Sequence, residues 1–317
     1  MGSGSDVLGY DTARSTDHGW GPRMHLFVEE ADVAGVASRV DEGLPETFRG
    51  WPTRYGWDAV PVQHHVVVSP LGPWLRRRLG VEPGEGMRTV DWLAMPQQKL
   101  LEVTAGAVFH DDTGDLTRAR RMLAWYPDEV WRWLLACQWR RLDQEEPFVG
   151  RTAEVGDELG SRILAARLAR DLMRLCLLLD RRYAPYSKWL GSAFARLEVA
   201  ANLTHPLGAA LAATTFPERE AALVEAFQIV ARHHNALGVT RPVPADVSQF
   251  HGRPFRVLGS GRFVDACLAE VADPWLRGLP LAGAIDQVAD STDVLEDADA
   301  PRRLTALYSG PSADEVE

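Results

Sequence analysis

The residues with the clearest chemical potential lie in the segment GSGSDVLGYDTARSTDHGWGPR, residues 2–23. Gly4 and Ser5 are expected to form a tight turn, because a glycine lets backbone N–H groups approach a phosphate closely and the serine adds a hydroxyl. Asp17 follows Ser5 by twelve residues, and a carboxylate is an oxygen ligand that suits Mg²⁺. The residue types of this segment could therefore bind a phosphate group and a divalent cation.

The order of these residues resembles the signature of the DNA polymerase β-type nucleotidyltransferase superfamily, in which a Gly-Ser pair precedes an acid on a strand. Over nearly its full length the chain also resembles a bacterial family of nucleotidyltransferase-like proteins of unknown function. The segments that carry this resemblance are residues 4–23, 91–114, 120–131, 145–161, 183–194 and 280–295. The resemblance implies a nucleotidyltransferase-type sheet domain and a helical domain like that of aminoglycoside adenylyltransferases.

This resemblance implies transfer of a nucleoside monophosphate, with AMP expected, from Mg²⁺-bound ATP or another NTP to a hydroxyl or amine of a small molecule. The metal would bridge the phosphates and neutralise charge on the attacking and leaving oxygens. Asp17 is the expected metal ligand and catalytic carboxylate. Gly4 and Ser5 would bind the triphosphate, and Arg23 is placed to meet a phosphate. The cleft between the two domains is the expected site.

The metal-binding motif is incomplete. The superfamily pattern is acid–x–acid, because residues i and i+2 of a strand point to the same side and can bind one metal together. Residues 17–19 are Asp-His-Gly, and the strand-like segment 62–69 offers two histidines but no further acid. Loss of these ligands should weaken Mg²⁺ binding. Two alternatives therefore stay open, a catalytically degenerate nucleotide-binding sensor or scaffold, and a transferase that modifies a protein or tRNA.

A second candidate segment is PYSKW, residues 185–189, which resembles the helix start in aminoglycoside adenylyltransferases where a lysine reaches the nucleotide phosphates. Lys188 would supply a mobile charge, and Tyr186 or Ser187 a hydroxyl near the helix N-terminus. Among 34 basic residues only Lys99 and Lys188 are lysines, which favours a specific role. The alternative is a surface lysine beside packed aromatic residues.

Acidic residues cluster after the first long helical segment, at Glu145, Glu146, Glu154, Asp157 and Glu158. Related antibiotic-modifying transferases take a general base from around the domain junction, so Glu145 and Asp157 are candidate catalytic residues. Otherwise these acids are helix-start and surface charges. Four arginines on one helix face are either phosphate ligands or a solvated stripe: Arg167, Arg170, Arg174 and Arg181.

Composition limits the class of partner. The net charge of −10 argues against a general nucleic-acid-binding protein and suits a cationic small-molecule acceptor. The chain has no apolar run long enough to span a membrane and no secretory signal at its start. Three widely spaced cysteines, Cys137, Cys176 and Cys267, are expected to be reduced core residues. A cytoplasmic location is expected.

The elements that must position these residues change in type along the chain. Strands are expected at 24–30, at 62–69 and within 99–112, with short helices at 31–44 and 73–80. Long amphipathic helices are expected from Pro127 onward, over 164–179, 187–203 and 216–238. These patterns predict an α+β fold with a small mixed-sheet domain, residues 1–114, followed by a larger all-helical domain, residues 115–317.

Overall fold

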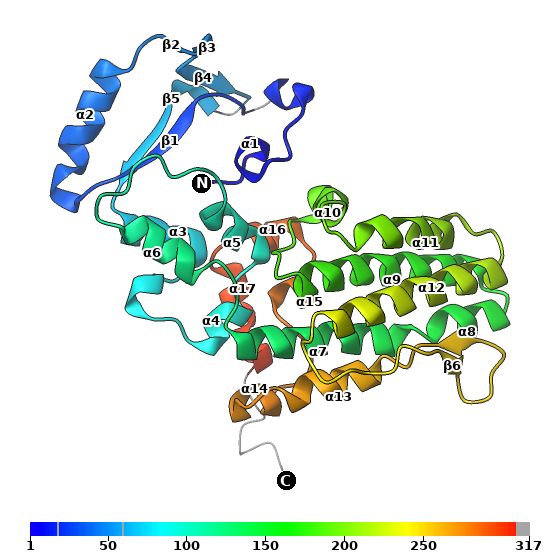
Figure 1. Cartoon of the computed structure of the whole chain (residues 1–317). Helices are drawn as coiled ribbons and strands as arrows, with labels where there is room; N and C mark the ends of the chain where they lie inside the picture. The colour runs from blue at the N-terminus through cyan, green and yellow to red at the C-terminus, as the bar shows by residue number, and fades with distance from the viewer. Residues whose placement is uncertain (18, 59, 309–317) are drawn as a thin grey trace.

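The computed structural model of the chain describes residues 1–17, 19–58 and 60–308, with the side chain of Asp17 outside that description. Figure 1 shows a small sheet at one end and a larger helical region beside it. The α+β architecture expected from the sequence is therefore confirmed. Nowhere in these ranges is a helix both long enough and apolar enough to cross a membrane.

The main sheet has three strands in the order β1-β5-β4. β1 (Arg23–Phe27) runs parallel to β5 (Val60–Ser69), and β4 (Arg54–Trp57) pairs antiparallel with β5. The predicted strands at 24–30 and 62–69 are confirmed as β1 and β5. The valine residues of β5 favour pleated backbone. β4 is not among the strands predicted from the sequence. A separate hairpin joins β2 (Thr47–Phe48) to β3 (Trp51–Pro52).

One face of the sheet turns toward the rest of the molecule. Alternate residues of a strand share a face, so Arg23, His25 and Phe27 point to the same side of β1. The rings of His25 and Phe27 lie 5.1 Å and 5.4 Å from the ring of Trp74, between centroids. Trp74 belongs to α3 (Leu71–Leu79), which therefore docks on this face. The predicted helix at 31–44 is confirmed as α2 (Val33–Gly43), which packs against β5.

Short helices lead from the sheet into the helical region: α3, α4 (Thr89–Leu93), α5 (Gln97–Thr104) and α6 (Asp115–Met122). The third strand predicted within residues 99–112 is wrong, because residues 97–104 form α5. A short apolar run fits a buried helix as well as a strand. Here the fully buried Leu100 and Val103 have the three-residue spacing of one helix face.

The helical region is built on three long helices, α7 (Asp128–Glu145), α9 (Glu158–Leu179) and α12 (Phe216–Ala236). α8 (Phe148–Glu154), α11 (Ala200–Ala212) and α13 (Gly261–Ala269) pack against them. The predicted apolar face of α7 is confirmed, because all of its members are buried: Trp131, Leu134, Leu135, Gln138 and Leu142. The three cysteines are likewise buried and free, and burial raises their pKa.

The helix predicted over 187–203 is two helices in the structure, α10 (Ser187–Phe194) and α11. The residues between them contain neither glycine nor proline, so the residue types do not mark the break. Arg196 lies within this break and donates a hydrogen bond to the carbonyl oxygen of Gly9. The interruption thus coincides with a contact to the N-terminal segment.

The chain after α13 returns to the first helices through α14 (Pro274–Gly278), α15 (Ile285–Val288), α16 (Thr292–Glu296), α17 (Ala300–Arg303) and the 3₁₀ helix Leu304–Tyr308. A short hairpin of β6 (Ser248–Gln249) and β7 (Arg256–Val257) precedes α13. Arg302 pairs with Asp91 at 3.0 Å. One hydrophobic core extends from Trp74 to Tyr308. The division at residue 114 stays a prediction.

Candidate functional site

The Gly-Ser pair begins a one-turn helix, α1 (Ser5–Leu8), in place of the expected turn between longer elements. Gly4 has an ordinary φ of −66°, so the backbone conformation does not call for glycine here. The missing side chain is the feature that matters. A Cβ at Gly4 would lie 2.3 Å from the Arg23 guanidinium and 2.3 Å from the Asp6 carboxylate. A side chain at this position would therefore displace the ends of the Arg23 and Asp6 side chains.

That ion pair joins α1 to the start of β1. The Nε of Arg23 donates to one oxygen of Asp6 at 3.3 Å, and its Nη2 donates to the other. Both side chains are about 30% exposed, at 30% for Arg23 and 28% for Asp6. A two-point pair of this kind fixes orientation as well as charge. The charge of Arg23, predicted to meet a phosphate, is thus already compensated.

Asp17 lies at the end of the 3₁₀ helix Ala13–Asp17, and the prediction that it begins a strand is wrong, because β1 begins at Arg23. Gly19, Gly21 and Pro22 separate the two, and the glycines take positive φ values of 59° and 157°. Such a backbone interrupts strand pairing. In the described part of the chain, no group of three or more His, Cys, Asp and Glu could hold a metal ion. The Mg²⁺ site at Asp17 stays a prediction.

The loop after Asp17 lies on aromatic rings of β4. A Cβ at Gly21 would lie 2.5 Å from the ring of Tyr55, so the backbone rests directly on that ring. A Cβ at Gly19 would be in ordinary contact with Trp57, at 3.4 Å. Tyr55 in turn packs on His65 of β5, with 4.2 Å between ring centroids. The rings of Tyr55 and Trp57 belong to β4, the strand that was not predicted from the sequence.

The second candidate segment lies at the start of α10. Lys188 is exposed, and its Nζ lies 5.5 Å from the ring centroid of Trp189. Tyr186 is the N-cap residue, and its backbone N–H donates to the side chain of Gln98 at 3.2 Å. Ser187 is exposed at the first turn. The lysine is thus a solvent-facing charge beside an aromatic ring.

The structure brings the N-terminal segment and α10 together. Tyr10 stacks on Trp189 with 5.2 Å between ring centroids, and Tyr186 meets the same ring edge-on at 4.9 Å. Arg196 lies 4.2 Å above the ring of Tyr10 and bonds the carbonyl of Gly9. The two predicted binding segments, residues 2–23 and 185–189, are far apart in the sequence but lie close together in the fold (Figure 1).

The candidate bases Glu145 and Asp157 have partners of their own. Arg167 donates to Glu145 from its Nε at 3.0 Å. Asp157 caps α9 by accepting from the backbone N–H of Gly160 at 2.8 Å. Figure 1 shows the start of α9 beside α8, at the end of the bundle away from α1 and α10. A helix of 22 residues is about 33 Å long, so Asp157 lies far from Ser5.

The predicted arginine stripe of α9 makes local contacts. Arg170 and Arg181 form ion pairs with Asp290 and Asp128, at 3.6 Å and 2.8 Å. Arg174 is largely buried and donates to the carbonyl of Asp286. With Arg167 on Glu145, each of the four arginines has a protein partner. These four arginines therefore form contacts between α9 and neighbouring parts of the chain.

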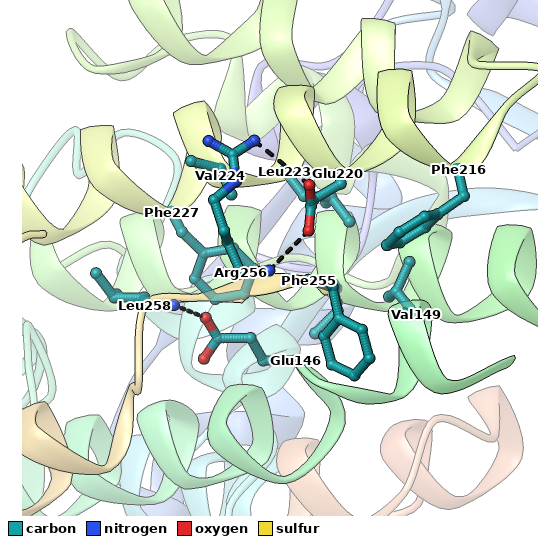
Figure 2. Close-up of a pocket in the computed structure, with 12 residues that line it drawn as sticks. Glu146, Val149, Phe216, Glu220, Leu223, Val224, Phe227, Phe255, Arg256 and Leu258 are labelled. Carbon is teal, nitrogen blue, oxygen red and sulfur yellow. Dashed lines mark hydrogen bonds and ion pairs between the residues drawn. The ribbon is translucent and has the colours of Figure 1, made fainter. Parts of the chain in front are cut away.

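Glu146, the neighbour of a predicted base, has the more unusual environment (Figure 2). It is 8% exposed and accepts hydrogen bonds from the backbone N–H of Leu258 and the hydroxyl of Ser260. Burial raises its pKa to about 7 even though these donors oppose the shift. The adjacent cavity, about 20 Å³, has room for a single water. Glu146 thus anchors the segment before α13 and faces no ligand-sized space.

A larger pocket lies between the sheet, the first helices and the returning C-terminal segment. Its volume is about 360 Å³, in the range of small-molecule sites. We name it the junction pocket and define it by its lining residues His25, Val67, Trp74, Arg77, Arg78, Lys99, Glu296 and Ala298. Of these, sequence reasoning singled out Lys99 alone, through the scarcity of lysine.

Comparison with known proteins gives one family similarity. Residues 92–190 match a domain of unknown function, DUF4037. This range runs from α4 to the start of α10 and includes Lys99 and Lys188, but it does not reach the segment 2–23. No curated protein and no solved structure matches the chain.

Proposed function

We propose that the chain binds a nucleoside triphosphate where the N-terminal segment meets α10, and that it transfers the nucleoside monophosphate, AMP in the leading case, to a hydroxyl or amine of a small molecule. The observation that supports this proposal best is the contact of Tyr10 and Gly9 with Trp189 and Arg196. It joins the two segments that the sequence resemblance assigns to the nucleotide.

Each binding residue has a distinct role in this proposal. Gly4 and Ser5 provide a side-chain-free approach and a hydroxyl for the phosphates. Lys188 adds a flexible point charge from the start of α10. Arg23 holds α1 in place through Asp6 and contributes little free charge. Asp17 is the proposed ligand of Mg²⁺, which when bound neutralises charge on the transferring phosphate.

One observation favours a second candidate function, nucleotide binding without transfer. The position of the second metal carboxylate is occupied by Gly19, in a left-handed backbone. Asp6, another carboxylate of the segment 2–23, is paired with Arg23. A sensor or scaffold of this kind would bind NTP with little dependence on metal and would not turn over.

The two functions are separated by measuring NTP binding calorimetrically with and without Mg²⁺, and transfer of labelled nucleotide to a panel of amino-sugars and metabolites. The transferase predicts metal-dependent binding and a labelled product, while the sensor predicts binding alone. Lys188→Ala should weaken ATP binding about tenfold, the loss of one charge-assisted contact. Arg232→Ala, which removes an exposed charge from α12, is the matched control. No binding of any NTP overturns both functions.

Gly19→Asp tests the missing carboxylate directly. The φ of 59° lies in the left-handed region that aspartate tolerates better than most residues, and the added Cβ meets Trp57 at an ordinary 3.4 Å. We expect the variant to fold and to bind Mg²⁺ more tightly in the presence of ATP. If it abolishes an existing transfer activity, the wild-type loop is already competent and the sensor function fails.

A further inference from the structure

The junction pocket is a built site with walls from distant parts of the chain. His25 and Val67 are direct partners across the parallel pair β1 and β5 and form the wall on the sheet side. Trp74 packs against His25 and is 4% exposed. Lys99 of α5 and Glu296 of α16 complete the lining. Helices and strands from distant parts of the chain therefore form the lining of this space.

Cationic side chains outnumber acidic ones in the lining of the junction pocket. Arg78 and Lys99 share a single carboxylate, Glu102, with Nη1 and Nζ at 3.1 Å and 3.5 Å from the same oxygen. Arg77 is exposed and has no side-chain hydrogen bond or ion pair within residues 1–17, 19–58 and 60–308. The carboxylate of Glu296 is the one acid in the lining. This concentration of cations contrasts with a chain of net charge −10.

The buried lysine is the strongest sign that an anion belongs here. Lys99 is only 7% exposed, and a buried ammonium is costly unless it is paired and hydrogen-bonded. Its contact with Glu102 is long, and Arg78 competes for the same oxygen. Two cations thus depend on one carboxylate oxygen, and an anionic group in the pocket would add a second acceptor.

The pKa of His25 is also affected by the nearby positive charges. Burial lowers its pKa to about 4, and the positive charges of the N-terminal amine, Arg78 and Arg23 act in the same direction. The ring is therefore neutral at pH 7. Its Nδ1 is buried and has no hydrogen-bond partner among the residues that the structure describes.

We propose that the junction pocket binds the phosphate group of a small molecule, held by the cationic side chains Arg77, Arg78 and Lys99. Guanidinium and ammonium groups together are the usual protein ligands of phosphate. This site differs from the cationic-acceptor site that the net charge predicts, since its lining attracts anions. The inference does not depend on nucleotide transfer, and it holds if the chain transfers nothing.

The test uses inorganic pyrophosphate as the probe and calorimetry on the full chain. We expect wild type to bind it and Arg77→Ala to weaken binding about tenfold, because one charge-assisted contact is lost. Arg232→Ala, a change of the same charge on α12, should leave binding within about twofold, because Arg232 is exposed and does not line the pocket. Lys99→Met should also weaken binding. Arg77 is exposed, so its variant carries the test if Lys99→Met fails to fold.

A second variant tests the sign of the charge. Glu296→Gln removes the one acid from the lining, so pyrophosphate should bind severalfold more tightly to this variant. Weaker binding to Glu296→Gln would overturn the proposal, since it would mean that the pocket selects a cation. Absence of binding to wild type, or an equal loss in Arg232→Ala, would overturn it as well.

The phosphate could belong to the nucleotide or to another metabolite, and a competition experiment distinguishes the two. If saturating ATP displaces pyrophosphate, and Arg77→Ala weakens ATP as well, the nucleotide is the source. If pyrophosphate binds equally well with ATP present, the pocket takes a second phosphorylated molecule. Both outcomes retain the anion site, and the transfer assays above fail or succeed separately.

Discussion

At the scale of the single residue, Glu146 couples the stability of the fold to pH. Its carboxyl group is buried against α8 and the segment before α13, which raises its pKa to about 7. In the unfolded chain the pKa of this carboxyl group is near its ordinary value of 4.5. Between these values the unfolded chain has released the proton and the folded chain retains it. The contribution of Glu146 to the free energy of unfolding therefore falls as pH rises from 4.5 to 7.

We predict that Glu146→Gln removes this loss, which is on the order of 3 kcal/mol. Glutamine keeps an acceptor for the N–H of Leu258 and carries no charge. Urea unfolding at pH 5 and pH 8 checks the prediction, with wild type measured beside the variant. Asp286, whose pKa burial raises to about 6, acts in the same direction in both proteins, so the comparison cancels it. Equal pH dependence in the two proteins would contradict the assignment.

The sequence predicts an acidic cluster at the end of α7, but it does not show which of these acids is buried. Glu145 and Glu146 are neighbours, yet Arg167 neutralises the first while the second is buried. Adjacent residues of a helix point in different directions, and which one faces the core depends on its partner. That partner, Leu258, lies 112 positions further along the chain. The single lysine of the junction pocket could be noticed from composition, but its burial could not.

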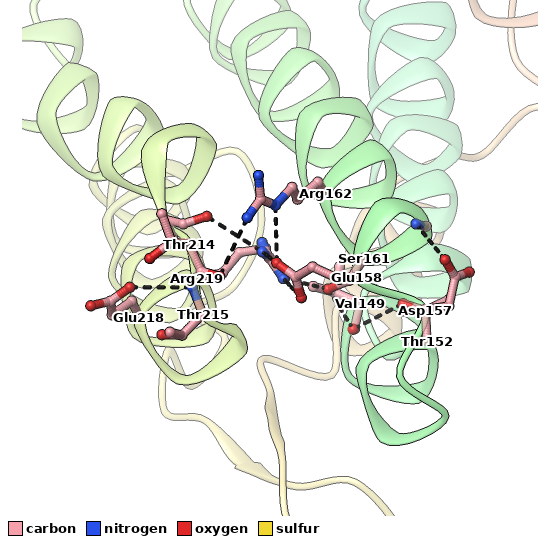
Figure 3. Close-up of polar contacts among 12 residues, drawn as sticks. Val149, Thr152, Asp157, Glu158, Ser161, Arg162, Thr214, Thr215, Glu218 and Arg219 are labelled. Atoms are coloured by element: carbon pink, nitrogen blue, oxygen red, sulfur yellow. Dashed lines mark hydrogen bonds and ion pairs between the residues drawn. The ribbon is translucent and has the colours of Figure 1, made fainter.

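At the scale of the element, a buried arginine joins the starts of α9 and α12 (Figure 3). Arg219 of α12 is 0% exposed and donates to the hydroxyl of Ser161 at 2.7 Å and to the carboxylate of Glu158. It also reaches the carbonyl of Ala213 at 3.4 Å. Arg162 binds the same carboxylate from the exposed side of α9, at 3.0 Å.

These two arginines give a matched pair of variants. Arg219→Met should lower the free energy of unfolding by about 1–3 kcal/mol, because the buried Ser161 hydroxyl and Ala213 carbonyl lose this donor. Arg162→Ala should have a small effect, since exposed ion pairs contribute little. Chemical denaturation of both variants is the measurement. Similar losses in the two would mean that the charge of Glu158 matters and the buried geometry does not.

Element prediction from the sequence succeeded where periodicity was long and failed where it was short. The apolar faces of α7 and α9 extend over several turns and could be recognised. The run that forms α5 is too short to distinguish a helix from a strand, and it was assigned wrongly. The break between α10 and α11 coincides with the contact of Arg196 with Gly9, which no local pattern encodes.

At the scale of the whole molecule, the residues of the sheet are less buried than those of the helical region. Ser69 is the one buried residue among the described residues of β5, and β1 is half-buried or exposed throughout. The centre of the helical region contains the fully buried Trp133 and Trp139. Local opening should therefore occur first in the sheet, because few apolar contacts oppose it.

We predict that amides in residues 60–69 exchange hydrogen about tenfold or more faster than those in residues 131–142. Hydrogen exchange followed by mass spectrometry of the two peptides measures this directly. Equal protection in both would show that the sheet and the helical core open as one unit. A saturating phosphate ligand should slow exchange in residues 60–69 selectively if it contacts the wall formed by His25 and Val67.

The overall α+β order could be predicted from the sequence, but the junction pocket could not. Its lining comes from positions 25, 67, 77, 99 and 296, and only the tertiary fold brings these together. The family similarity covers residues 92–190 and so contains Lys99 alone among them. Pattern reasoning along the chain finds segments such as 2–23, whereas a pocket of this kind is assembled from single residues.

The return of the C-terminal segment has a consequence for the order of events during synthesis. Glu296 and Ala298 line the junction pocket, and Arg302 pairs with Asp91. A ribosome makes these residues long after β1, α3 and α5 have left the exit tunnel. Until they emerge, the cationic wall of the pocket lacks its final side and stays open to solvent. The junction pocket is therefore enclosed on this side only after residues 296 and 298 have been made.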